Sequence, residues 1–238
     1  RAAALGHGDL ATSLVLIVPL FLAYEVGVMF SSSINGADIV TRTVFAAVGH
    51  DRDRYLVVHL LLAVAFAAWV LVARRQQVFR PGVLVPLLLE AAIYALTLGT
   101  AILVVMQHVL GVDGGLAIAG APGLLALGRA GEALVTSLGA GVHEELVFRL
   151  ALMSGALYLL HRGGVRRLLA LELALLFSAL LFSWAHHLGP HGQPFAAPVF
   201  TYRVLAGVAF GLIYYHRSLA HAVYAHVLYD LYVQVIRG

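Results

Sequence analysis

The stretch "VLVPLLLEAAIYALTLGTAILVVMQHVL", residues 83–110, decides the fold class of this chain. It contains one acidic residue, Glu90, and is otherwise almost entirely apolar. A helix rises about 1.5 Å per residue and needs roughly twenty mostly apolar residues to cross the hydrocarbon core of a bilayer. The stretch is long enough for this, so it predicts a transmembrane helix.

Similar apolar runs lie on both sides of this stretch, and each predicts a further span. They cover residues 10–30, 55–73, 134–160, 168–185, 199–215 and 219–235. In the glycine-rich segment 111–131, the apolar piece 116–127 is too short to cross and is expected to be re-entrant or interfacial. We therefore expect an all-α integral membrane protein, a bundle of seven or eight transmembrane helices around a polar intramembrane cavity. Residues 1–238 are expected to form a single transmembrane domain, with its motif-bearing core at 131–235.

The composition agrees with this class of protein. The chain is 61% hydrophobic and only 11% charged, whereas soluble domains are nearer one quarter charged, and its mean hydropathy is +0.92. The net charge of +3 is small and suggests the lipid bilayer as a partner, not a nucleic acid. The absence of cysteine excludes disulfides and thiolate metal sites. Arginine without lysine and heavy Ala and Leu usage suggest a GC-rich prokaryotic genome, and hence a prokaryotic cytoplasmic (inner) membrane.

The stretch "GVHEELVFRL", residues 141–150, places ionisable side chains inside the predicted span 134–160. Each charged residue near the centre of a transmembrane helix costs about 2.5–3.5 kcal/mol. Glu145 and Arg149 are four residues apart, so they share a helix face and are expected to form an ion pair. Glu144 is rotated by about 100° around the helix relative to Glu145, so Arg149 holds it less directly and it can take part in catalysis. The structural alternative is a buried Glu–Arg pair that only fixes helix packing.

Two further motifs carry polar groups at matching depth. The stretch "FSWAHH" places Phe182 four residues before His186, and "HVLYD" places His226 four residues before Asp230. Each pair therefore shares one helix face, and Asp230 can accept a hydrogen bond from His226 or orient it. Successive spans cross the membrane in opposite directions, so the helix ends that carry these two motifs lie on the same side of the membrane as Glu144. The sequence thus predicts one site built by three helices.

These motifs resemble the CPBP family of intramembrane proteases, which includes Rce1-type CAAX endopeptidases and bacteriocin-processing or immunity proteins. The family pattern is Glu-Glu-x-x-x-Arg, then Phe-x-x-x-His, then His-x-x-x-Asn or Asp, each on a transmembrane helix. In this chain the matching residues are Glu144, Glu145, Arg149, Phe182, His186, His226 and Asp230, in the family's order. Asp230 stands where the Rce1-type enzymes carry Asn.

The resemblance implies an intramembrane endopeptidase with a defined division of roles. Glu144 and His186 would activate a water that attacks a peptide carbonyl, and His226, helped by Asp230, would stabilise the oxyanion or protonate the leaving group. Arg149 would hold Glu145 and meet a substrate carboxylate. The implied substrate is a membrane-embedded or membrane-anchored protein, cleaved at a C-terminal CAAX-type or sorting tail or at a leader peptide.

Other readings of the same residues remain open at this stage. No cofactor is the leading expectation, and a zinc enzyme with Glu144, His186 and His226 as ligands is the nearest alternative. A non-catalytic scaffold or a transporter is the other alternative, which acids in the first and third predicted spans favour. His187 competes with His186 for the catalytic assignment. His191 and His221 are expected to stand near the site as well.

Overall fold

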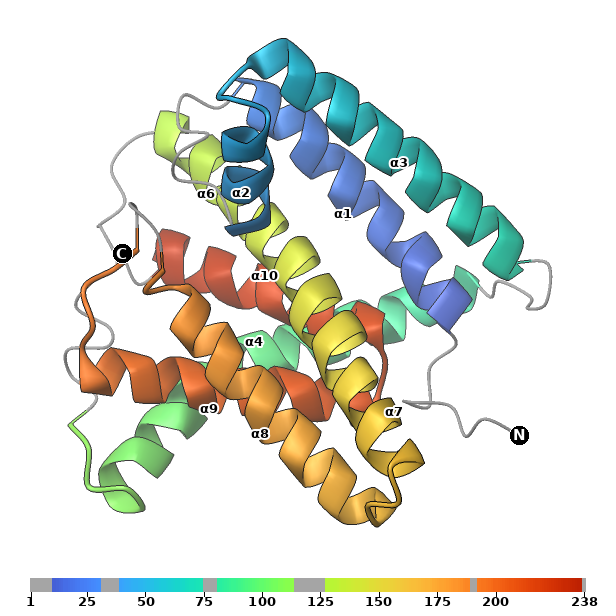
Figure 1. The fold of residues 1–238 in the computed structure, drawn as a ribbon. Coiled ribbons are helices and arrows are strands. Elements are labelled where there is room, and N and C mark those ends of the chain that lie inside the picture. Colours follow the sequence, from blue (N-terminus) through green and yellow to red (C-terminus); the bar gives the residue numbers. More distant parts are fainter. Residues whose placement is uncertain (1–9, 31–38, 75–80, 114–126, 189–191, 237–238) are drawn as a thin grey trace.

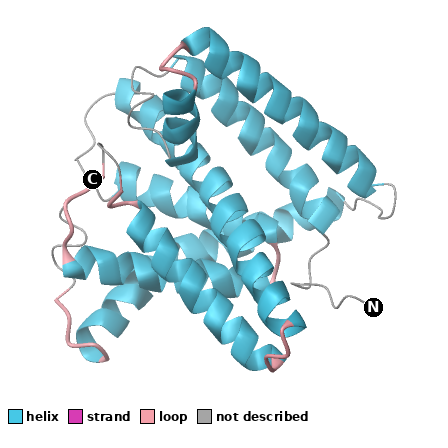
Figure 2. Cartoon of the chain, viewed as in Figure 1, coloured by secondary structure: helices cyan, strands magenta, loops and turns pink. Residues whose placement is uncertain are grey.

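Every regular element in the described part of the chain is a helix (Figures 1 and 2). The computed structural model describes residues 10–30, 39–74, 81–113, 127–188 and 192–236. The helices are α1 (Leu10–Phe30), α2 (Ile39–Ala47), α3 (Arg52–Arg74), a short 3₁₀ turn η2 (Pro81–Val83), α4 (Leu84–His108), α6 (Leu127–Gly139), η3 (Ala140–Met153), α7 (Ser154–Arg162), α8 (Arg167–Ala185), α9 (Ala197–His216) and α10 (Leu219–Ile236).

The long helix that runs from α6 through η3 to α7 crosses the molecule and contains the predicted span 134–160 (Figure 1). Its middle part, η3, is a π-helix and not the α-helix that the apolar run predicts. π-Helices are rare and often occur at functional sites. Two serine hydroxyls donate hydrogen bonds to backbone carbonyls of this segment. Ser178 of α8 donates to Phe148 O at 2.6 Å, and Ser154 donates to Arg149 O at 3.1 Å. These bonds help to satisfy a backbone whose pairing pattern is irregular.

The π-helix η3 packs closely against α10, which also packs against α4. Gly141 permits this approach, because a Cβ atom there would lie 2.4 Å from Val227 Cγ2 and 2.9 Å from the Val227 backbone nitrogen. Contacts this short require the backbone of α10 to move. The glycine therefore sets the spacing between the two helices that carry Glu145 and His226.

The helices α1, α2 and α3 lie together on one side of the molecule (Figure 1). Asp51 caps the start of α3, since its carboxylate accepts the backbone N–H groups of Asp53 at 2.9 Å and Arg54 at 3.1 Å. Tyr55, the first residue of the predicted span 55–73, is buried in the core. The polar segment before this span thus contains the short helix α2 and a capped turn into α3.

The outer faces of the bundle are apolar. Side chains of α3 and α4 such as Leu60, Leu61, Val85 and Leu89 are 64–65% exposed, and a continuous apolar surface of this kind fits contact with lipid. Within the described residues, four helices are long and apolar enough to cross a membrane: α1 over Leu10–Val28, α4, α8 and α9. The chain is therefore a helical membrane protein, as predicted. The expected re-entrant piece 116–127 lies, apart from its last residue, outside the described residues.

Replacing Gly141 by Ala should lower stability by about 1–3 kcal/mol, because the added methyl group overpacks the contact with Val227. The midpoint of thermal unfolding in detergent would measure this. Gly155→Ala is the matched control, since a Cβ there meets nothing within 4 Å, and it should be neutral or slightly stabilising. Equal behaviour of the two variants would contradict the close approach of η3 to α10.

Candidate active site

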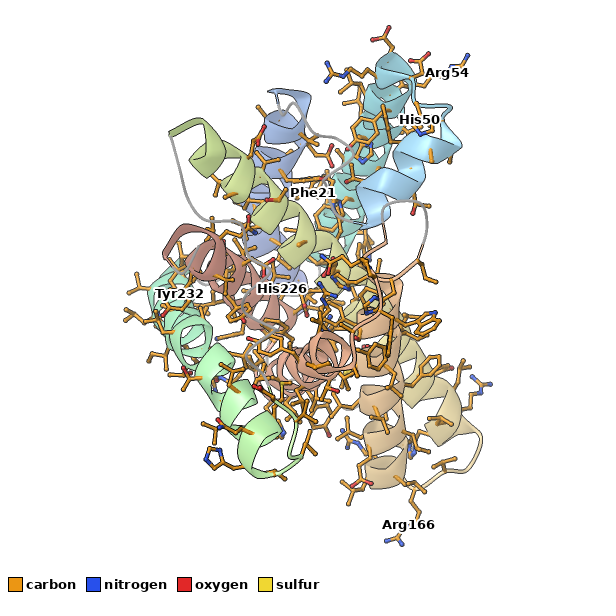
Figure 3. All side chains as sticks on the ribbon, turned by 90° about the vertical axis from the view of Figure 1, so that its left-hand side faces the viewer. Phe21, His50, Arg54, Arg166, His226 and Tyr232 are labelled. Carbon is orange, nitrogen blue, oxygen red and sulfur yellow. The ribbon has the colours of Figure 1, made fainter. Side chains whose placement is uncertain are left out.

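The predicted site residues meet where η3, the end of α8 and α10 pack together. His226 of α10 lies in the interior of the bundle, surrounded by helices (Figure 3). Glu144 and Glu145 come from η3, and His186 directly follows α8. Three segments that are far apart in the sequence thus contribute polar groups to one place.

Glu145 is the fixed carboxylate of the site. Its Oε2 lies 3.1 Å from Arg149 Nε, and its Oε1 lies 2.8 Å from His226 Nδ1. The ion pair that the four-residue spacing predicts is therefore present. The side chain of Glu145 is 0% exposed and that of Arg149 is 1% exposed, so both charges depend on these partners for solvation.

Arg149 is enclosed by aromatic rings and backbone. Its guanidinium carbon lies 4.5 Å from the ring centroid of Phe182 and 5.6 Å from that of Phe210. Its Nη2 donates to the carbonyl of Gly207 in α9 at 3.3 Å. The expectation that Arg149 also meets a substrate carboxylate is wrong for this arrangement, because the rings and Glu145 cover the guanidinium. Arg149 instead ties η3 to α8 and α9.

Glu144 faces the two histidines. Its Oε1 lies 3.7 Å from His186 Nε2, and its Oε2 lies 3.9 Å from His226 Nε2. The side chains of Glu144 and His226 are 6% and 5% exposed, whereas that of His186 is 25% exposed. The carboxylate is therefore inside the protein, and His186 forms the more accessible edge of the site.

His186 is oriented by its own helix. Its Nδ1 lies 2.8 Å from the carbonyl oxygen of Phe182, and its ring packs edge-on against the Phe182 ring at 5.1 Å. A carbonyl only accepts, so Nδ1 carries the hydrogen and Nε2 is directed to Glu144. The neighbouring His187 instead bonds the carbonyl of Gln193 through Nδ1 at 2.9 Å. The geometry thus brings His186, and not His187, to Glu144.

Asp230 lies on the other side of His226 from Glu145. Its Oδ2 is 3.7 Å from His226 Nε2, and its side chain is 24% exposed. The predicted contact within the motif is present, but the hydrogen bond that holds the ring comes from Glu145 at 2.8 Å. Phe210 stacks on the same ring with centroids 4.5 Å apart and planes 16° apart. Phe210 has no motif signal, and sequence reasoning missed it.

Arg203 of α9 is the second residue that sequence reasoning missed. It interacts electrostatically with Glu144 and Asp230, and its Nη2 donates to Gln193 Oε1 at 2.6 Å. One signal was present in the sequence, since Arg203 is an ionisable residue within the predicted span 199–215 and such residues often mark functional sites in membranes.

The acids in the first and third predicted spans belong to separate clusters. Glu90 of α4 pairs with Arg217, and its Oε2 lies 3.6 Å from His221 Nε2. His221, which was expected to stand near the site, therefore belongs to the cluster around Glu90. Glu25 of α1 lies 3.7 Å from His59 of α3. His191 lies outside the described residues.

The donor atoms of the zinc alternative do not form a ready-made metal centre. Among the described residues, no group of three or more His, Asp or Glu side chains is arranged to hold a metal ion. The two oxygens of Glu144 face different imidazoles. The zinc alternative with Glu144, His186 and His226 as ligands therefore stays a prediction.

The comparison with protein families agrees with the family predicted from the three motifs. Residues 126–232, a little under half of the chain, match the model of the family described as type II CAAX prenyl endopeptidase Rce1-like. This part of the chain is similar to the Rce1-like family. The match spans all three motifs and confirms the predicted family. No curated protein and no solved structure matches the chain.

The Rce1-like region and the apolar helices together support a coarse description of the protein. It is an integral membrane protein with the family features of an intramembrane endopeptidase, a hydrolase, and its expected substrate is membrane-associated. The residues brought together in the Rce1-like region are those that the motifs single out.

Replacing Arg149 by Met should destabilise the protein by about 3–5 kcal/mol, because it leaves the Glu145 carboxylate buried without its cation. Adding Glu145→Gln to this variant should recover part of the loss. Thermal unfolding in detergent measures both effects. Arg162→Met, at the exposed end of α7, is the control and should change stability by no more than about 0.5 kcal/mol. A wild-type unfolding temperature for Arg149→Met would show that this pair does not hold the helices.

Proposed function

We propose that this protein is a glutamate-dependent intramembrane endopeptidase that cleaves near the terminus of a membrane-associated protein. The observation that carries the proposal is the position of Glu144, a buried carboxylate within 3.7–3.9 Å of two imidazoles from other segments. Glu145 is held by Arg149 and His226. The two glutamates of the motif therefore differ: Glu145 is fixed by its partners, and Glu144 faces the imidazoles with which it can exchange a proton.

The gap between Glu144 and His186 suits a shared water. Glu144 Oε1 is an acceptor when the carboxylate is ionised, and His186 Nε2 is an acceptor because Nδ1 donates to Phe182. Two acceptors 3.7 Å apart do not bond each other, but one water can donate a hydrogen to each. Its oxygen lone pairs then point away from both groups, toward an approaching carbonyl carbon.

Peptide hydrolysis then follows with a balanced transfer of protons. Glu144 takes a proton from the water as its oxygen bonds to the carbonyl carbon and the carbonyl oxygen becomes an oxyanion. Protonated His226, whose Nδ1–H is bound to Glu145, donates from Nε2–H to stabilise that charge. As the C–N bond breaks, the proton passes to the leaving nitrogen, which departs as an amine. The other product is a carboxylic acid, and the carboxylate of Glu144 is regenerated.

Asp230, at the accessible edge of the site, supports the buried imidazole of His226. Its carboxylate, 3.7 Å from His226 Nε2, favours the protonated ring that an oxyanion needs. Its position therefore fits electrostatic support, since an ionised carboxylate cannot donate a hydrogen bond to the oxyanion as an amide can.

We further infer the membrane arrangement and the substrate class. The helices α3 and α10 and the continuous helix 127–162 cross the bilayer beside the four apolar helices, which makes seven spans, in a prokaryotic inner membrane. The substrate is a membrane-anchored protein cut at a C-terminal CAAX-type or sorting tail, or at a leader.

Glu144→Gln should reduce cleavage at least 100-fold while leaving the unfolding temperature near that of the wild type, because it removes the base and keeps the shape. The measurement is mass spectrometry of membrane-protein termini in cells that make either form, followed by cleavage of internally quenched, N-terminally lipidated peptides with apolar C-terminal residues. Glu172→Gln, the same change at an exposed position of α8, is the control and should cleave normally.

Two results separate the alternatives in this experiment. Normal cleavage by Glu144→Gln would remove Glu144 from the mechanism. A wild-type protein that changes no terminus and cleaves no peptide would favour the scaffold or transporter reading.

Treatment of the purified protein with 1,10-phenanthroline should leave cleavage unchanged, because the proposed water is activated by Glu144 and His186 without a metal. Metal content is measured on the same sample by plasma mass spectrometry. Loss of activity that returns on adding Zn²⁺, together with about one zinc per chain before treatment, would favour the zinc alternative with Glu144, His186 and His226 as ligands.

A further inference from the structure

Arg203 is a cation at the rim of the site whose hydrogen-bonding capacity is only partly used. Its Nη2 donates to Gln193 Oε1 at 2.6 Å. Its Nη1 is buried and has no hydrogen-bond partner among the described residues. A guanidinium presents its donors as a planar fork that matches a carboxylate, so a second, anionic partner would complete its bonding.

Gln193 fixes Arg203 relative to the catalytic histidine. The backbone N–H of Gln193 donates to the carbonyl of His186 at 2.9 Å, and its own carbonyl accepts from His187 Nδ1 at 2.9 Å. Its side chain at the same time accepts from Arg203. Two hydrogen bonds of Gln193 therefore link the segment after α8 to the cation on α9, and the third, from His187, fixes Gln193 itself.

An open apolar pocket of about 650 Å³ adjoins this arrangement. It is lined by Trp184, His187, Gly192, Gln193, Pro194 and Phe195. The rings of Trp184 and Phe195 are 49% and 61% exposed, and Gln193 belongs both to the pocket wall and to the Arg203 contact. Apolar surface beside a single well-placed cation is the surrounding expected for a ligand with an apolar body and one anionic end.

Electrostatics decides where an anion can sit. Arg203 interacts with Glu144 and Asp230, and both are acids. These acids disfavour a substrate carboxylate beside them, whereas the Arg203 guanidinium attracts one. Arg149 does not compete for it, because its side chain is 1% exposed and already pairs with Glu145.

We propose that Arg203 binds the C-terminal carboxylate of the substrate, while the apolar residues just before that terminus occupy the pocket of Trp184 and Phe195. This rests on the proposed peptidase function and selects among its substrates. A carboxylate bound at Arg203 therefore holds the substrate terminus beside the segment that carries His186.

The test uses the best-cleaved lipidated peptide in two forms, one with a free C-terminal carboxylate and one with a C-terminal carboxamide. The wild type should cleave the acid with a kcat/KM on the order of 10- to 100-fold higher than the amide, since a charge-assisted pair is lost. In Arg203→Gln this ratio should fall to near one, and in Arg203→Lys it should be intermediate. The matched control is Arg166→Gln, at an exposed position that lies at the far end of the molecule (Figure 3), and it should keep the wild-type ratio.

A role for Arg203 in charge balance alone would lower cleavage of both peptides equally and leave the ratio unchanged, which would overturn the proposal. Equal cleavage of acid and amide by the wild type would also overturn it, and this result does not depend on how well any variant folds. In both cases, loss of cleavage in Glu144→Gln would still support the peptidase function. A wild type that cleaves neither peptide rejects both.

Discussion

The arrangement of the site depends on one buried carboxylate. Glu145 accepts contacts from Arg149 on its own helix and from His226 on α10, and it is fully enclosed. A charge inside a membrane protein is stable only where partners replace the water that it has lost. The same contacts that make Glu145 tolerable therefore fix the ring of His226 and the packing of η3 against α10.

The two adjacent glutamates consequently have different surroundings. Glu145 is held between a guanidinium and an imidazole, whereas Glu144 faces two histidines at 3.7 and 3.9 Å. Adjacent side chains on a helix point in different directions, so a Glu-Glu pair provides a structural and a reactive carboxylate at one depth. The π-helical form of η3 and the close approach of Gly141 to Val227 determine which residues of the other helices each glutamate side chain faces.

The accessible edge of the site differs in character from its interior. Arg149 and His226 lie against aromatic rings and Glu145 is buried between them, while His186 and Asp230 are about one-quarter exposed. Arg203 and Gln193 extend the polar groups from this edge toward an apolar pocket. Glu144 and the two histidines carry the proposed chemistry, whereas Arg203 and the apolar pocket carry the proposed substrate recognition.

The membrane helices and part of the candidate site can be predicted from the amino-acid sequence. Long apolar runs predict membrane helices, because a buried backbone in lipid must satisfy its own hydrogen bonds, and spacings of four residues predict the Glu145–Arg149 pair. The tertiary structure alone decided the π-helix, the choice of Glu145 as the hydrogen-bond partner of His226, the enclosure of Arg149 and the place of Arg203 at the rim. Spacing along a helix determines which side chains share a face. Contacts between helices depend on how those faces pack, and that depends on the shape of the whole bundle.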